Sequence, residues 1–215
     1  MKYKLIFLFD KKNIWIKKYI NPSDFIFKNK FIVRTTSNLK NLQKYDIVII
    51  LGYTKIINPK ILSTNKLTII VHPSKLPANK GFAPIAYQVL KNKKNIYFSI
   101  IKLEKKVDSG DIILQNRVSL NGTELSNELR EIQAYQTIKI IKNFLKNYPR
   151  MKLKKQKGKG NFNKRRTKKD SEININKSIK SQFNHLRICD NDEYPAFFKY
   201  KNNKYLLKIY KEIKN

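Results

Sequence analysis

Four short apolar runs near the start of the chain constrain its fold more than any other feature. They are rich in strand-forming residues and lie at Leu5–Phe9, Phe31–Val33, Ile47–Leu51 and Leu67–Val71. Continuous apolar runs of this kind are typical of strands that are covered on both faces, as in a parallel sheet. The segments between them have helical or loop character, at 13–20, 39–45 and 59–63. This alternation predicts an α/β fold with right-handed crossovers.

The middle of the chain predicts two helices and a further strand. Pro84 fits the first turn of a helix through Leu90, because a first turn leaves its N–H groups unpaired and proline has none. Residues 95–104 alternate in the manner of a strand. From Thr123 onward, apolar residues recur at helical spacing, which predicts an amphipathic helix capped by Thr123 that ends before Pro149.

The composition changes after this helix and predicts three regions. Residues 1–149 form the main domain, and residues 150–170, dense in lysine, form a basic linker or exposed loop. Residues 171–215 form a small C-terminal region, in which Ser178 can cap a short helix and Asn202-Asn203 can turn a β-hairpin. The predicted fold class is therefore a Rossmann-like, mostly parallel α/β sheet with helices on both faces, plus a small C-terminal helix and hairpin.

Charge and cysteine content restrict the location of the chain more than its activity. The formal net charge is +32, and lysine far outnumbers arginine. This excess fits either a coding bias or an electrostatic benefit for a polyanionic or nucleotide ligand. Cys189 is the only cysteine, which fits a reducing compartment, and no apolar run is long enough to span a bilayer. We expect a cytoplasmic protein without membrane insertion.

One pair of motifs indicates an enzyme. His72 stands just beyond an apolar run, in His-Pro-Ser-Lys-Leu-Pro, and Lys80-Gly81 follows. Later, Asp108 opens an Asp-Ser-Gly turn that can return to the histidine across a fold. Together they would supply an acid/base pair. Taken singly, His72 could merely end a strand, and Asp108 could merely form a turn before Gly110.

The ordered set of motifs resembles the folate-dependent formyltransferase family, which includes methionyl-tRNA, glycinamide ribonucleotide and sugar N-formyltransferases. The resemblance covers residues 47–145 and, more loosely, 165–209. Such enzymes carry a formyl group from N10-formyltetrahydrofolate, their co-substrate, to a primary amine. The resemblance implies that His72 transfers the proton and that Asp108 is its electrostatic and orienting partner. An imidazole, with an ordinary pKa near about 6.5, can relay a proton at neutral pH.

The resemblance also implies positions for the ligands. The folate pocket would be formed by backbone of Leu51, Gly52, Tyr53, Val107, Asp108 and Gly110. A substrate phosphate would meet Lys80 and Gly81. Tyr53 could equally be ordinary packing, and Lys80 one more solvated lysine. We expect no metal site.

One position departs from the family pattern. Family members usually carry an asparagine two residues before the histidine, where its amide can donate to the oxyanion, but this chain has Ile70. Losing such a donor typically costs about 3 to 4 kcal/mol of transition-state stabilisation. We expect a replacement donor: the Ser74 hydroxyl, a backbone N–H or the imidazolium of His72.

The C-terminal motifs bear on the substrate. Residues 165–173, 184–187 and 194–198 look like the region shared by tRNA and sugar formyltransferases. The residues after Pro149 are expected to be too few to form the OB-like tRNA-binding domain. This favours, as the substrate, the amine of a UDP- or dTDP-linked amino sugar in surface glycan or lipopolysaccharide biosynthesis. Nucleic acid is then not an expected partner, and a homodimer is suggested only by analogy. The alternatives are methionyl-tRNA formylation and a catalytically degenerate binding protein.

Overall fold

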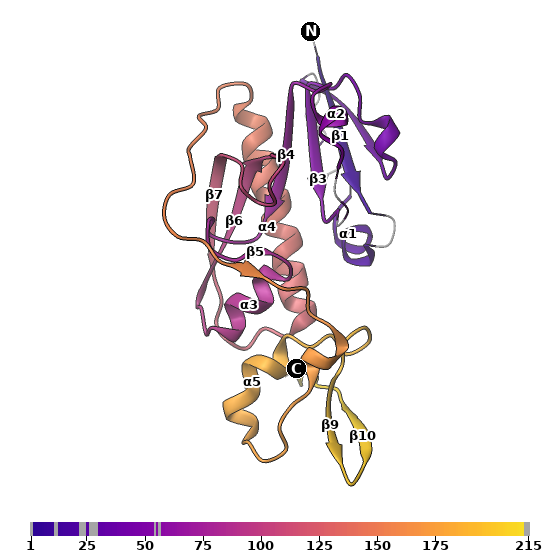
Figure 1. The fold of residues 1–215 in the computed structure, drawn as a ribbon, viewed down its shortest axis with the longest axis vertical. Helices are drawn as coiled ribbons and strands as arrows, with labels where there is room; N and C mark the ends of the chain where they lie inside the picture. The colour runs from indigo at the N-terminus through magenta and orange to yellow at the C-terminus, as the bar shows by residue number, and fades with distance from the viewer. Residues whose placement is uncertain are drawn as a thin grey trace.

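A six-stranded sheet forms the centre of the computed structural model, which describes residues 2–10, 13–21, 25, 30–53, 55 and 57–212 (Figure 1). The strand order is β2-β1-β3-β4-β6-β7. The bounds are β1 (Tyr3–Phe9), β2 (Phe31–Thr36), β3 (Ile47–Leu51), β4 (Leu67–His72), β6 (Asn95–Lys102) and β7 (Ile112–Ser119). The first four strands in this order are parallel, whereas β6 and β7 are antiparallel to their neighbours. The predicted α/β class with a mostly parallel sheet is confirmed.

Helices cover both faces of the sheet. The helices up to the end of α4 are α1 (Ile14–Tyr19), η2 (Leu39–Asn41), α2 (Pro59–Leu62), α3 (Pro84–Leu90) and α4 (Ser126–Asn147), and the C-terminal region adds η3 (Lys168–Ser171) and α5 (Ile179–Arg187) beyond the sheet. Leu5 and Phe7 of β1 pack in the core that contains α1 and α4, while Ile6 and Leu8 pack in a second core with η2 and α2. Successive strand residues point to opposite faces, so a strand covered on both sides must be apolar throughout.

The chain returns to the sheet after α4 and crosses it on the β7 side (Figure 1). Lys154 forms a bridge with Ile112, and β8 (Phe162–Asn163) pairs in parallel with β5 (Lys80–Gly81). We call residues 154–163 the strap. Most of its residues are exposed, as expected of a basic loop, yet its two ends are bonded to the main domain. The boundaries 1–149, 150–170 and 171–215 stay a prediction.

The C-terminal region forms the predicted helix and hairpin. Ser178 caps α5 by accepting a hydrogen bond from Ser181 N, and β9 (Ala196–Tyr200) pairs with β10 (Asn203–Leu207). A small core of Leu186, Cys189 and Ala196 holds the helix to the hairpin.

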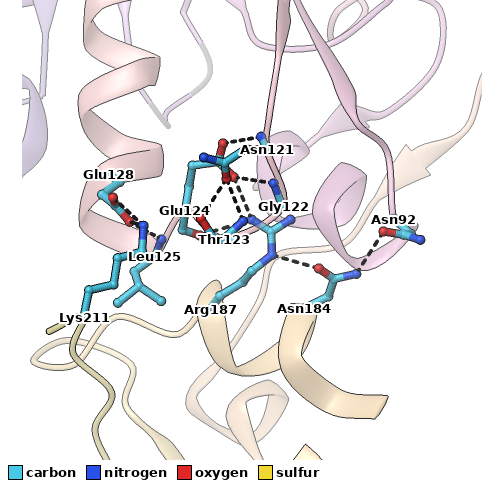
Figure 2. Close-up of polar contacts among 10 residues, drawn as sticks. All are labelled: Asn92, Asn121, Gly122, Thr123, Glu124, Leu125, Glu128, Asn184, Arg187 and Lys211. Atoms are coloured by element: carbon cyan, nitrogen blue, oxygen red, sulfur yellow. Dashed lines mark hydrogen bonds and ion pairs between the residues drawn. The ribbon is translucent and has the colours of Figure 1, made fainter. Parts of the chain in front are cut away.

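A buried ion pair joins this region to the main domain (Figure 2). Arg187 Nη1 contacts Glu124 Oε2 at 3.3 Å, and Arg187 Nε donates to Asn184 Oδ1 at 2.8 Å. Burial lowers the pKa of Arg187, and the nearby carboxylate of Glu124 opposes this shift.

The expected helix cap at Thr123 is wrong. Helix α4 begins at Ser126, and the Glu128 carboxylate accepts a hydrogen bond from Leu125 N at 2.7 Å.

Within the part of the chain that is described, no helix has both the length and the apolar character needed to cross a bilayer.

Candidate active site

His72 is the last residue of β4, and its imidazole is buried. The ring nitrogen Nε2 lies 2.8 Å from the backbone carbonyl oxygen of Asn79. Since a carbonyl can only accept, this contact assigns the proton of the neutral ring to Nε2 and leaves the lone pair on Nδ1. Nδ1 is therefore the ring nitrogen that can take up a proton.

Asp108 lies in the loop between β6 and β7, and its carboxylate reaches the same imidazole. Asp108 Oδ2 is 3.6 Å from His72 Nδ1 and accepts a hydrogen bond from Gly81 N at 2.8 Å. His72 and Asp108 are only 5% and 8% exposed. The carboxylate of Asp108 is thus held beside Nδ1 in a poorly solvated setting, where charges act on each other strongly. The two residues predicted as an acid/base pair thus come together in space.

Ser74 shapes the loop that follows His72. Its side chain is fully buried, and its hydroxyl donates to the Ala78 carbonyl at 2.8 Å. Its backbone N–H donates to the His72 carbonyl, and its own carbonyl accepts from Ser99 Oγ at 2.6 Å. The hydroxyl proton is committed within the loop, so the structure does not present Ser74 as a free oxyanion donor.

Ile70 offers no polar group at the position that differs from the family pattern. It lies in β4, in register with Ile50 of β3 and Ile101 of β6, and is half-buried. Of the replacement donors expected from the sequence, the imidazolium of His72 and backbone N–H groups remain.

Gly81 belongs to the frame of the pair. It has φ 86°, and a Cβ there would approach the Asn163 carbonyl to 2.6 Å, so a side chain would disturb the β5–β8 pairing. Its N–H is the one that binds Asp108. Lys80 precedes it in β5 with a half-buried side chain. Of the two residues predicted to bind substrate, Gly81 contacts Asp108 directly, and Lys80 is its neighbour in β5.

Leu51, at the end of β3, lines a cavity of about 460 Å³. Phe9 of β1 and Thr35 of β2 also line it, so the cavity lies at the carboxyl ends of three parallel strands. The strand order reverses between β1 and β3, and open α/β sheets bind ligands at such a switch point. The volume is in the range of small-molecule sites, but neither His72 nor Asp108 lines this cavity.

Three other predicted folate residues have structural tasks of their own. Gly52 has φ 55°, and the place of its missing side chain is taken by Asn13, whose Nδ2 donates to the Gly52 carbonyl at 2.9 Å. Tyr53 packs against the second core. At Gly110, a Cβ would collide with the Lys102 carbonyl. Packing against backbone therefore requires glycine at 110, whereas at 52 the positive φ favours it.

Val107 differs from these residues because its side chain is 52% exposed beside the Asp108 loop. Its side chain is accessible from solvent, and the assignment of the backbone around Asp108 to folate stays a prediction.

The strap supplies site residues that the sequence did not reveal. Gln156 Nε2 donates to the carbonyls of Asp108 and Gly110, and Asn161 Oδ1 accepts from Asn79 N at 2.9 Å. The strap is lysine-rich and has no apolar periodicity, so its sequence did not predict that Gln156 and Asn161 lie beside the active-site loops.

No group of three or more potential metal ligands of the His, Cys, Asp and Glu types occurs among the residues that the structure describes.

Comparison with known proteins identifies the family of the chain. The family described as formyl transferase matches residues 7–143, which is more than half of the chain. The chain belongs to the formyl transferase family. The resemblance inferred from the motifs around His72 and Asp108 is therefore confirmed.

Formyl transferases with different substrates resemble this chain. The methionyl-tRNA formyltransferase of Thermosipho melanesiensis is 32% identical over 162 residues, covering 75% of this chain and 52% of that protein. The chain thus spans about half the length of that curated relative. The structure of methionyl-tRNA formyltransferase from Clostridium thermocellum matches with TM-score 0.78 at 20% identity, over 94% of this chain and 90% of that one. A sugar N-formyltransferase from Shewanella sp FDAARGOS_354 matches with TM-score 0.73 at 18% identity, over 99% of each chain.

Formyltetrahydrofolate is the formyl donor of this family, and unpartnered polar atoms near the pair fit such a ligand. Of the buried side-chain nitrogen and oxygen atoms in the described residues, four have no hydrogen-bond partner. Three of them are Asn79 Oδ1, Gln156 Oε1 and Asn163 Nδ2, on the segments that adjoin His72 and Asp108. Buried polar groups are normally paired, so a polar ligand would satisfy them.

Proposed function

We propose that this protein transfers a formyl group from N10-formyltetrahydrofolate to a primary amine, with His72 as the proton-transfer group. The observation that carries the proposal is the 3.6 Å approach of Asp108 Oδ2 to His72 Nδ1, the ring nitrogen with the free lone pair. Membership of the formyl transferase family supplies the reaction class.

The proton balance of the reaction assigns a task to each member of the pair. The amine nitrogen forms a bond to the formyl carbon, and the bond from that carbon to the folate nitrogen breaks. The amine loses one proton and the departing folate nitrogen gains one, so a group that accepts and returns a proton suffices. His72 Nδ1 takes the proton from the amine and gives it to the leaving nitrogen. Asp108 stabilises the imidazolium between these two transfers.

Asn79 and Gly81 keep the pair in place during these transfers. The Asn79 carbonyl binds Nε2 in both protonation states of His72, because Nε2 carries a proton in each. The Gly81 N–H binds Asp108 Oδ2 and fixes the carboxylate. The imidazolium is the cation available to the negative charge that develops on the formyl oxygen, since Ile70 cannot donate.

We further propose that the amine belongs to a UDP- or dTDP-linked amino sugar used in surface glycan or lipopolysaccharide biosynthesis. The match over 99% of both chains to a sugar N-formyltransferase supports a fold compatible with this substrate class. Lys80, in β5 next to Gly81, is the residue we assign to a substrate phosphate.

Methionyl-tRNA is the second candidate. It is favoured by the 32% identity to the Thermosipho melanesiensis enzyme and by the net charge of +32, which would attract a polyanion.

A formylation assay separates these proposals. The purified protein is incubated with N10-formyltetrahydrofolate and either a panel of UDP- and dTDP-amino sugars or charged methionyl-tRNA, and products are detected by mass spectrometry. We expect one added formyl group on an amino sugar, lost in His72→Asn while the fold is retained by circular dichroism. Formylation of the tRNA alone would move the assignment to the second candidate. Binding without any product would reduce the protein to a degenerate relative.

A further inference from the structure

The backbone at Asp108 has a conformation that its surroundings must maintain. Its φ is 48°, in the left-handed region that residues with a side chain adopt at a cost in energy. Residues held there persist when neighbouring contacts fix them. The direction of the Asp108 carboxylate, and hence its distance to His72, depends on those contacts.

Gln156 contacts the loop at Asp108 itself and at Gly110, two residues further along the chain. Its single Nε2 donates to the Asp108 carbonyl at 2.9 Å and to the Gly110 carbonyl at 2.8 Å. A primary amide has two N–H groups, so one side chain can satisfy both carbonyls at once. The two bonds hold the ends of the Asp108–Gly110 turn at a fixed separation.

The strap fixes Gln156 from two directions. On one side, Lys154 and Ile112 exchange backbone hydrogen bonds of 2.9 and 2.8 Å. On the other, Asn161 Oδ1 accepts from Asn79 N, and β8 pairs with β5. Gln156 lies between these attachments, so its backbone has little freedom to withdraw from the loop.

We propose that Gln156 is a positioning residue, which sets the Asp108 carboxylate against His72 Nδ1 from outside the main domain. The inference rests on the proposed function for its effect on turnover, but the positioning itself is a property of the structure. The strap would then influence catalysis indirectly, because Gln156 acts only through the loop that carries Asp108.

The decisive variant is Gln156→Glu, which keeps the shape of the side chain and removes both N–H donors. Its carboxylate would face two carbonyl oxygens, so the Asp108 turn should move. Gln156→Ala removes the contact without adding charge. Lys157→Ala is the matched control, because it changes the next strap residue, whose side chain is exposed.

Two readouts test the proposal. We expect kcat to fall about tenfold in Gln156→Ala and further in Gln156→Glu, with KM for both substrates within about twofold, since the lost contacts touch neither ligand. Independently, imidazole ¹⁵N spectra report on His72, one of only two histidines in the chain, after assignment with His185→Gln. The Nδ1 resonance of His72 should shift in both Gln156 variants and stay in place in Lys157→Ala.

The spectroscopic readout needs no turnover, so it separates failure of this inference from failure of the proposed function. The wild-type protein could show no formylation while the Nδ1 resonance still moves as expected in the Gln156 variants. That result would support the positioning role and refute the proposed formyl transfer. An unchanged Nδ1 resonance in both Gln156 variants would overturn the inference even in an active enzyme. An equal shift in Lys157→Ala would do the same.

Discussion

Removing either partner of the buried Arg187–Glu124 pair should destabilise the protein, and by unequal amounts (Figure 2). After Arg187→Met, the Glu124 carboxylate keeps two donors, Asn121 N at 2.6 Å and Gly122 N at 3.1 Å. After Glu124→Ala, the guanidinium keeps only neutral acceptors, the Glu124 carbonyl and Asn184 Oδ1. Glu124→Ala therefore leaves a buried charge with weaker compensation than Arg187→Met does.

The contacts set the size of the difference. Breaking a buried pair costs about 3 to 5 kcal/mol when the remaining charge has no compensation. We expect about 4 kcal/mol for Glu124→Ala, which also deprives two loop N–H groups of their acceptor, and about 2 kcal/mol for Arg187→Met. With a urea dependence of about 2 kcal/mol per molar, the unfolding midpoints should fall by about 2 M and about 1 M.

Urea unfolding followed by far-ultraviolet circular dichroism measures these shifts. Asp192→Ala is the control, because its ion pair with Lys208 is exposed and should contribute less than about 1 kcal/mol. The double variant should lose less than the sum of the single ones, since neither charge is left unpaired. The reasoning is refuted if Arg187→Met costs more than Glu124→Ala, or if both match the control.

Three further outcomes are expected. Asp108→Asn should lower kcat about a hundredfold or more, because it removes a charge 3.6 Å from His72 Nδ1; an unchanged rate in the formylation assay would contradict this. Ile70→Asn should raise kcat about tenfold by restoring the donor of the family pattern, and a drop with the fold intact would show that another group serves. Lys66 holds the pKa of the Asp46 carboxyl below its ordinary value. Asp46→Asn should therefore be less stable at neutral pH, and the deficit in urea unfolding should shrink as the pH falls from about 4 through the folded pKa.

The sequence predicted the strands and helices whose signal is local. The run at Ile47–Leu51 coincides with β3 because burial on both faces requires unbroken apolar character. Pro84 begins α3, and Ser178 caps α5. The predicted cap at Thr123 failed because Glu124 is drawn into the pair with Arg187 and organises the preceding turn through backbone N–H groups. That pairing joins distant parts of the chain.

By itself, the sequence predicted five of the six strands of the central sheet, all but β7, and through its ordered motifs the convergence of His72 with Asp108, since apolar runs and motifs both leave a pattern in the order of residues. Only the tertiary structure decided which imidazole nitrogen is free and that Gln156 holds the Asp108 loop. The physical reason is the same for both. The partners are backbone carbonyls, which every residue possesses, so no complementary side chain in the sequence marks the contact.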